Sequence, residues 1–256
     1  MSATELSFLA PGNFPEIQPG DDLADLIASA LAGDGLDLQD GDLVVVAQKI
    51  VSKAEGRLQR LEEVEPSSRA RELALICQKD PRVIELVLRE SRSVLRCVPG
   101  IIVVEDVRGF VMANAGIDSS NVVAQGGAET VLLLPVDPDA SAARLQWALC
   151  RRYDAEIGVV INDSFGRAWR KGTVGTALGV AGMPGLLDLR GSPDRQGRKL
   201  QSTELGVADE VAAGASLIMG QAREGRPVVR VRGFPYHLRS GAGSELIRPA
   251  RQDLFR

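Results

Sequence analysis

Hydrophobic and polar positions alternate along the chain with two periods, one typical of helices and one of buried strands. Residues 23–31 carry leucine, isoleucine and alanine at helical spacing, directly after Asp21 or Asp22. Because aspartate is a preferred N-cap, we expect a helix to begin there. Residues 43–47 form a continuous apolar run after an Asp-Gly turn. This run predicts a strand that is covered on both faces.

The same patterns predict further elements along the rest of the chain. Helices are expected over residues 67–78, 81–89, 138–153 and 204–221, and strands over residues 101–104, 109–112, 131–134, 158–161 and 227–231. Asp137 is expected to cap the third of these helices, where Pro138 fits the first helical position. Since strands and helices alternate, the predicted fold class is mixed α/β (α+β). No domain boundary is readable, so residues 1–256 are expected to form a single unit.

Composition and charge exclude several classes of function. Hydrophobic residues make up 45% of the chain and charged residues 25%, which is typical of an ordinary globular protein. The net charge of -4 provides no overall field that would attract nucleic acid. No apolar stretch is long enough to span a bilayer, so no membrane partner is expected. An anionic ligand would therefore have to rely on local cations.

Cysteine and histidine usage narrows the chemistry further. Cys77, Cys97 and Cys150 are far apart, form no CxxC motif and are odd in number, and the N-terminus has no signal-peptide pattern. We therefore expect three reduced core thiols and a cytoplasmic location. The single histidine, His237, excludes zinc sites with several histidines, and its loop-like surroundings favour an ordinary surface residue. Acid–base chemistry is left to carboxylates, lysine, metal or substrate.

One polar cluster directly follows the apolar residues 158–161. Asp163 and Ser164 form an acid–hydroxyl pair of the kind that holds magnesium at nucleotide sites. Arg167 and Arg170 follow, and guanidinium groups bind phosphate or carboxylate oxygens in a bidentate manner. Strand ends are where open α/β folds place their ligands. A solvated loop explains the same residues equally well.

Two other clusters flank apolar runs. Residues 52–56 include Lys53, a suitable point charge for a phosphate, although a solvated lysine–glutamate pair explains this cluster better on its own. Residues 114–121 include Asp118 and Asn121 around a glycine. They are consistent with a carboxylate presented to a hard cation, but their composition alone favours a turn.

The last cluster, residues 219–226, lies at the end of a predicted helix. Gly220 or Gly225 is expected to form its C-cap turn, which accounts for the segment without any function. The chain contains no GxxxxGK[ST] motif, so a phosphate loop of the Walker type is excluded. Any nucleotide site must follow a less common design.

Taken in this order, the clusters resemble those of the coenzyme F-420-0:L-glutamate ligase family, the γ-glutamyl ligases of deazaflavin coenzyme biosynthesis. The matching segments are FPEIQPGDDL, GDLVVVAQKIVSKAEGR, ANAGIDSSN, LLPVDPDASA, INDSFGRAWRKGTVGTALG, GVADEVAAGASLIMGQ and PARQDLFR. The resemblance covers nearly the whole chain. It implies an unusual α/β fold with two subdomains and an intertwined homodimer.

The resemblance also implies a reaction. Members of the family use GTP with magnesium or manganese, are stimulated by potassium, and join L-glutamate to the lactyl-phosphate carboxylate of coenzyme F-420-0. GTP phosphorylates that carboxylate, the glutamate amine attacks the acyl phosphate, and GDP and phosphate leave. Later additions extend the product through γ-linkages.

The family's functional positions map onto matching residues of this chain. The implied metal ligands are Asp118, Asp163, Ser164 and Gln221, the last being Glu or Gln in relatives. The implied nucleotide contacts are Phe14, Pro15, Glu16, Ile17, Gln48, Lys49, Lys53, Asn121, Met219, Gly220, Gln221, Ala222, Arg223, Glu224, Gly225 and Arg226. Gln48 and Lys49 replace smaller hydroxyl residues of some relatives. Lys53, Arg167 and Arg170 are expected to act in catalysis by neutralising phosphate charge.

Other functions use the same residues. A metal-dependent phosphohydrolase or phosphotransferase would need the same acids but would release GDP without glutamate. A related amide ligase would act on another carboxylate acceptor. A nucleotide-binding regulator would bind without turnover, and it leaves the acids Asp118 and Asp163 unexplained.

Overall fold

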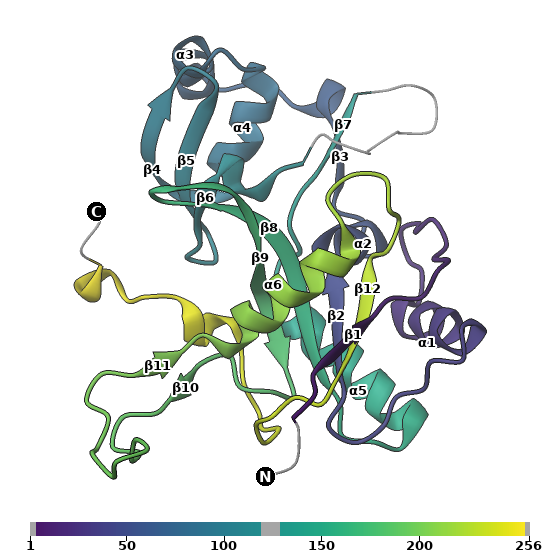
Figure 1. Cartoon of the computed structure of the whole chain (residues 1–256). Coiled ribbons are helices and arrows are strands. Elements are labelled where there is room, and N and C mark those ends of the chain that lie inside the picture. Colours follow the sequence, from purple (N-terminus) through teal and green to yellow (C-terminus); the bar gives the residue numbers. More distant parts are fainter. Residues whose placement is uncertain (1–3, 119–128, 254–256) are drawn as a thin grey trace.

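The main feature of the computed structural model is a five-stranded sheet with helices on both faces (Figure 1). The structure describes residues 4–118 and 129–253. The strand order is β1 (Ser7–Leu9), β12 (Val228–Arg232), β2 (Leu43–Ala47), β8 (Gly158–Arg167) and β9 (Arg170–Ala181). Strands β2 and β8 are parallel, whereas the other neighbours are antiparallel. The predicted mixed α/β class is confirmed.

Two hydrophobic cores lie on opposite faces of this sheet. One face packs against α6 (Val207–Met219), and the other core involves α1 (Leu23–Gly33), α2 (Gln48–Ala54) and α5 (Pro138–Tyr153). Strand β2 contributes Val44 and Val46 to the second core and Leu43 and Val45 to the first. Because alternate side chains of a strand point to opposite faces, β2 is buried on both sides, as its apolar run predicts.

A third core lies in a layer beside this sheet, at the top of Figure 1. It is formed by α3 (Ser68–Cys77), α4 (Pro81–Arg89) and the strands β4 (Ser91–Val98) and β5 (Ile101–Asp106). Strand β6 (Val111–Ala113) pairs with β5 and completes a three-stranded sheet. The remaining elements are short. They are β3 (Leu58–Arg60), β7 (Thr130–Leu132), β10 (Leu187–Asp188), β11 (Glu204–Leu205) and the 3₁₀ turns η1 (Leu61–Glu63), η2 (Asn114–Gly116), η3 (Gly243–Leu246) and η4 (Ala250–Gln252).

Local capping chemistry explains where the helices begin and end. The Asp22 carboxylate accepts hydrogen bonds from the N–H groups of Ala24 and Asp25, so Asp22 and not Asp21 caps α1. Asp137 caps α5 as predicted. Gly220, with φ +74°, ends α6, which is shorter than predicted because Glu204 and Leu205 belong to β11. No helix in residues 4–118 and 129–253 is long and apolar enough to cross a membrane.

The expectation that all three cysteines are core residues is only partly correct. All three are free thiols, but Cys77 alone is buried, whereas Cys97 and Cys150 are partly exposed.

The prediction that Asp163 and Ser164 follow the end of a strand is wrong. Strand β8 continues to Arg167 and forms a hairpin with β9, so both residues lie within the strand. The parallel pairing with β2 ends where Ala47 faces Asn162, but the antiparallel pairing with β9 goes on. Asp163 therefore lies one residue beyond the parallel ladder.

Two carboxylates anchor the segment that follows β12. Asp139 of α5 accepts hydrogen bonds from the backbone N–H groups of Gly243 and Ser244. Glu245 accepts hydrogen bonds from Leu186 N at 3.0 Å and from the Arg239 guanidinium at 3.0 Å. These contacts fix the path of the chain towards residues 246–253.

Glu245 should make the free energy of unfolding of the protein depend on pH in the acid range. The Arg239 hydrogen bond, helped by the Leu186 and Ala242 N–H groups, lowers the pKa of Glu245 below its usual value. A lowered folded-state pKa stabilises the protein above the unfolded-state pKa, and this stabilisation is lost as pH falls through the folded-state pKa. Glu245→Gln is therefore expected to cost roughly 1 kcal/mol at neutral pH.

Urea unfolding of both proteins at a series of pH values tests this expectation, with the exposed Glu62→Gln as control. The difference between wild type and Glu245→Gln should shrink as the solution becomes more acidic. A difference that stays constant across the acid range would contradict the assignment.

Candidate active site

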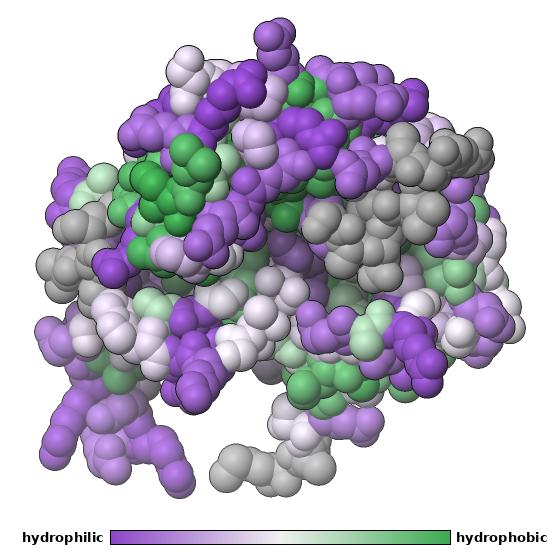
Figure 2. Space-filling model, turned by 90° about the horizontal axis from the view of Figure 1, so that it is seen from above, coloured by the Kyte–Doolittle hydropathy of each residue, from purple (hydrophilic) through white to green (hydrophobic). Residues whose placement is uncertain are grey.

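Two cavities meet beside the β8–β9 hairpin. The small cleft, of about 280 Å³, lies between residues 14–17, α2, β8 and the segment after α6. The central cavity, of about 1120 Å³, lies between the hairpin and the β4–β6 sheet. The residues that line both are Gln48, Lys49, Asp163, Ser164 and Gln221. Seen from above, the surface is hollowed near its middle, with hydrophobic and hydrophilic side chains around the hollow (Figure 2).

The structure brings the two predicted acids, Asp118 and Asp163, to the same cavity. The Nζ atom of Lys49 lies 2.5 Å from Oδ2 of Asp118, whose backbone is held in place by two hydrogen bonds with Leu132. Burial raises the pKa of Asp163 to about 6, and the negative charge of Asp118 acts in the same direction. The Ser164 N–H and the Lys49 ammonium oppose this rise. Two acids and one lysine therefore share one electrostatic environment.

The donor atoms around this cluster suit a hard divalent cation. Besides Asp118 and Asp163, Ser164 and Gln221 also line the central cavity, and their side chains carry a hydroxyl oxygen and an amide oxygen. The buried Oδ1 atoms of Asn114 and Asn162 have no hydrogen-bond partner within the described residues. All of these groups offer the oxygen ligands that magnesium and manganese prefer.

The number of carboxylates limits the type of metal site. Within the described ranges, no three His, Cys, Asp or Glu side chains gather at a point that could hold a metal ion. A cation held by Asp118 and Asp163 would therefore need neutral oxygens and ligand phosphates to complete its shell. Magnesium is commonly bound in this way, through one or two carboxylates and the phosphates of a substrate. The residues present thus fit a magnesium–phosphate site.

Most residues expected to contact a nucleotide line the small cleft. They are Phe14, Pro15, Glu16, Ile17, Gln48, Lys49, Lys53, Met219, Gly220, Gln221, Ala222, Gly225 and Arg226. Arg223 and Glu224 do not line it, and the Glu224 carboxylate instead accepts a hydrogen bond from Ala222 N at 2.8 Å. Asn121 lies outside the described residues.

The three predicted catalytic cations lie in two different places. Lys53, in the last turn of α2, lines the small cleft and forms an ion pair with Glu16. Arg167 on β8 and Arg170 on β9 are register partners next to the tip of the hairpin. Both line the central cavity instead. Lys53 is therefore placed to meet a ligand in the small cleft, and the arginines to meet one in the central cavity.

Sequence reasoning assigned no role to Asn114 or Asn162. Asn162 donates through Nδ2 to Ser216 Oγ at 3.0 Å, which turns its unpartnered Oδ1 into a fixed acceptor. Asn114 begins a run of three residues with positive φ and lines the central cavity. The only available signal was the position of each asparagine directly after an apolar stretch.

The fold and the site define a class of protein, a mixed α/β protein with adjoining cavities that meet at a site suited to a cation and phosphate groups. Comparison with known proteins then gives the family. The sequence model of F420-0:gamma-glutamyl ligase matches residues 12–233, and the chain belongs to this family.

Several relatives resemble the chain over nearly its whole length. It is 47% identical to the coenzyme F420:L-glutamate ligase of Methanothermobacter thermautotrophicus, over 98% of this chain and 99% of the relative. The protein of the same name from Methanopyrus kandleri is 44% identical over 94% of each chain. The one from Halobacterium salinarum is 44% identical over 96% of this chain and 94% of the relative.

Proposed function

We propose that this protein is a GTP-dependent ligase that adds L-glutamate to the lactyl-phosphate carboxylate of coenzyme F-420-0. The observation that carries the proposal is the cluster of Lys49, Asp118 and Asp163 at the junction of the two cavities. Family membership and the names of the relatives support the choice of substrates.

The shapes of the cavities suit two of the three substrates. The small cleft, with Lys53 and the backbone of residues 219–222, receives the phosphates of GTP. The central cavity is large enough for a deazaflavin and has an apolar wall from β5 and β6. Arg167 and Arg170 on its other wall pair with the anionic tail of that acceptor. The carboxylate and the γ-phosphate then meet beside Asp163.

The proposed reaction has two steps, phosphoryl transfer from GTP and then formation of the amide bond. A carboxylate oxygen of the acceptor attacks the γ-phosphorus of GTP, and the bond to the β–γ bridging oxygen breaks to release GDP. The glutamate amine then attacks the acyl carbon, phosphate departs with the bonding electron pair, and the nitrogen loses a proton. Lys53 and the arginines stabilise the charge that moves during phosphoryl transfer. The side chains of Asp118, Asp163, Ser164 and Gln221 would hold a magnesium or manganese ion, which would supply further neutralisation of phosphate charge.

One assay tests the activity. Purified protein is incubated with GTP, manganese, potassium, L-glutamate and coenzyme F-420-0, and GDP and the deazaflavin product are quantified. The expected result is GDP release that requires glutamate, together with a product heavier by one glutamyl unit. GDP release at the same rate without glutamate would instead identify a phosphohydrolase.

Lys53→Ala is expected to raise the KM for GTP at least about tenfold, because a hydrogen bond to a charged phosphate is lost. The KM for L-glutamate should stay unchanged. Lys171→Ala, which removes a lysine at the tip of the hairpin outside both cavities, is the matched control. Titration calorimetry with GTP gives an independent measurement, and equal affinity of wild type and Lys53→Ala would remove Lys53 from the nucleotide site.

A further inference from the structure

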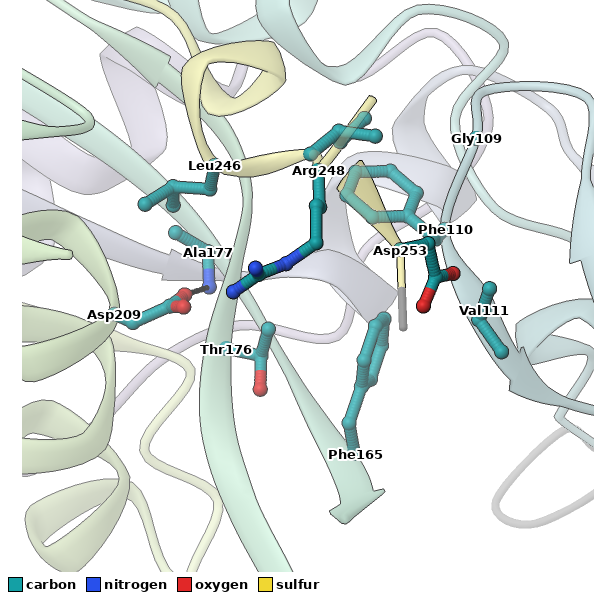
Figure 3. Close-up of a pocket in the computed structure, with 11 residues that line it drawn as sticks. Gly109, Phe110, Val111, Phe165, Thr176, Ala177, Asp209, Leu246, Arg248 and Asp253 are labelled. Carbon is teal, nitrogen blue, oxygen red and sulfur yellow. Dashed lines mark hydrogen bonds between the residues drawn. The ribbon is translucent and has the colours of Figure 1, made fainter. Parts of the chain in front are cut away.

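A third cavity, of about 250 Å³, is lined by Phe110, Phe165, Asp209 and Arg248 among other residues (Figure 3). We call it the side cavity. Its walls come from residues 109–111, the β8–β9 hairpin, the first turn of α6 and the C-terminal residues 246–253. Val111, Phe165 and Asp253 line both this cavity and the central one, so the two adjoin.

The side cavity contains a cation and an anion with unused hydrogen-bonding capacity. The Arg248 guanidinium points towards Asp209 and Thr176 (Figure 3), yet it forms no hydrogen bond or ion pair within the described residues. Asp209 accepts one hydrogen bond, from Ala177 N at 2.8 Å, and burial raises the pKa of its carboxyl. Its second oxygen has no partner among those residues. Opposite charges thus face one small space without pairing to each other.

The remaining walls are suited to methylene groups. The rings of Phe110 and Phe165 meet edge to face with centroids 6.2 Å apart, and Leu246 lines another side. At about 250 Å³, the side cavity is the smallest of the three cavities described here. A small zwitterion with an aliphatic chain matches both the size and the chemistry of this space.

The hairpin places the side cavity next to Asp163. Thr176 on β9 is the direct antiparallel partner of Asp163 on β8. Side chains at such positions share one face of the sheet and lie about 5 Å apart. Arg248 follows the turn that Asp139 and Glu245 anchor, so the backbone that leads to Arg248 is held in place before any ligand binds.

We propose that the side cavity is the binding site for L-glutamate, with a glutamate carboxylate on Arg248 and the glutamate ammonium on Asp209. The proposal rests on the ligase function proposed above. It gives the third substrate a site of its own, adjoining the cavity of the acceptor. The small cleft, the central cavity and the side cavity then follow one another in the order nucleotide, acceptor and amine.

Kinetics of Arg248→Gln and Asp209→Asn test this assignment in the full-length protein. Asparagine keeps an acceptor for Ala177 N, so the second variant loses charge without losing that hydrogen bond. Each variant is expected to raise the KM for L-glutamate at least about tenfold, since a charge-assisted bond is lost, and to leave the KM for GTP unchanged. Arg251→Gln and Glu210→Gln, whose side chains are neighbours outside the cavity, serve as controls. An unchanged KM for glutamate in both variants would overturn the proposal.

Equilibrium dialysis with radiolabelled L-glutamate separates this site from the proposed activity. The measurement is made with GDP and manganese and without acceptor, so it does not depend on turnover. Binding by wild type and both controls, with loss in Arg248→Gln and Asp209→Asn, is the supporting result. Equal binding by all proteins, or none by wild type, refutes the site. Wild-type binding without glutamate-dependent GDP release would instead refute the ligase function and keep the site.

Discussion

Replacing Asp163 with asparagine is expected to lower the rate of glutamate-dependent GDP release at least about a hundredfold, the usual effect of removing one well-placed group that stabilises moving charge. Within the described residues, Asp163 is the acid that lines both the small cleft and the central cavity. The substitution therefore removes negative charge at the junction where nucleotide and acceptor are proposed to meet.

The fold should tolerate this substitution. The Asp163 Oδ1 atom accepts a hydrogen bond from Ser164 N at 2.8 Å, and an asparagine carbonyl oxygen can replace it. The backbone pairing of β8 with β9 does not depend on the side chain. Activity and stability are therefore expected to separate in this variant.

Two measurements on the same preparation check the expectation, the rate of GDP release and the free energy of unfolding in urea. Asp194→Asn is the matched control, because Asp194 also accepts backbone N–H bonds but is partly exposed and lies outside the three cavities described above. Normal GDP release by Asp163→Asn would exclude Asp163 from the mechanism. A matching loss of stability would make its role structural.

Most elements could be predicted because their signals are local. The caps of α1 and α5, the apolar run of β2 and the proline at the start of α4 each depend on a few neighbouring residues. Strand β4 was missed because serine and arginine interrupt its apolar residues, and β9 because glycine and threonine interrupt its own. Both strands are stabilised by pairing with a neighbouring strand, and this pairing cannot be predicted from the residues of the strand itself.

In the candidate site, too, single residues could be predicted from their neighbours in the sequence, but contacts between distant segments could not. Asp118 and Asp163 were recognisable as an acid in a turn and an acid after an apolar run, but only the fold brings them to Lys49. The extension of β8 beyond Ile161 was not predictable, since its pairing with β9 continues through polar residues. The side cavity combines four distant segments, so Asp209 and Arg248 carried no signal in the sequence.

Asp106→Ala is expected to destabilise the protein by about 3–5 kcal/mol, the cost of removing one partner from a buried ion pair. Asp106 is fully buried, and its carboxylate accepts hydrogen bonds at 2.9 Å from the N–H groups of Arg108 and Phe110 and from the Arg108 guanidinium. Without it, these donors are left in the interior with no acceptor. The loop that carries Phe110 into the side cavity loses its anchor at the same time.

The effect should be large because Arg108 connects separate parts of the fold. Its guanidinium also binds Glu90 at the end of α4 and the carbonyl oxygen of Pro135, each at 2.8 Å. A guanidinium that has lost one of two acidic partners remains desolvated, whereas the exposed partners in a surface pair return to water. Glu72→Ala, which breaks the exposed pair with Arg69, is thus expected to cost less than about 1 kcal/mol in the same urea titration. Equal losses in the two variants would show that burial of the Asp106–Arg108 pair has no energetic consequence.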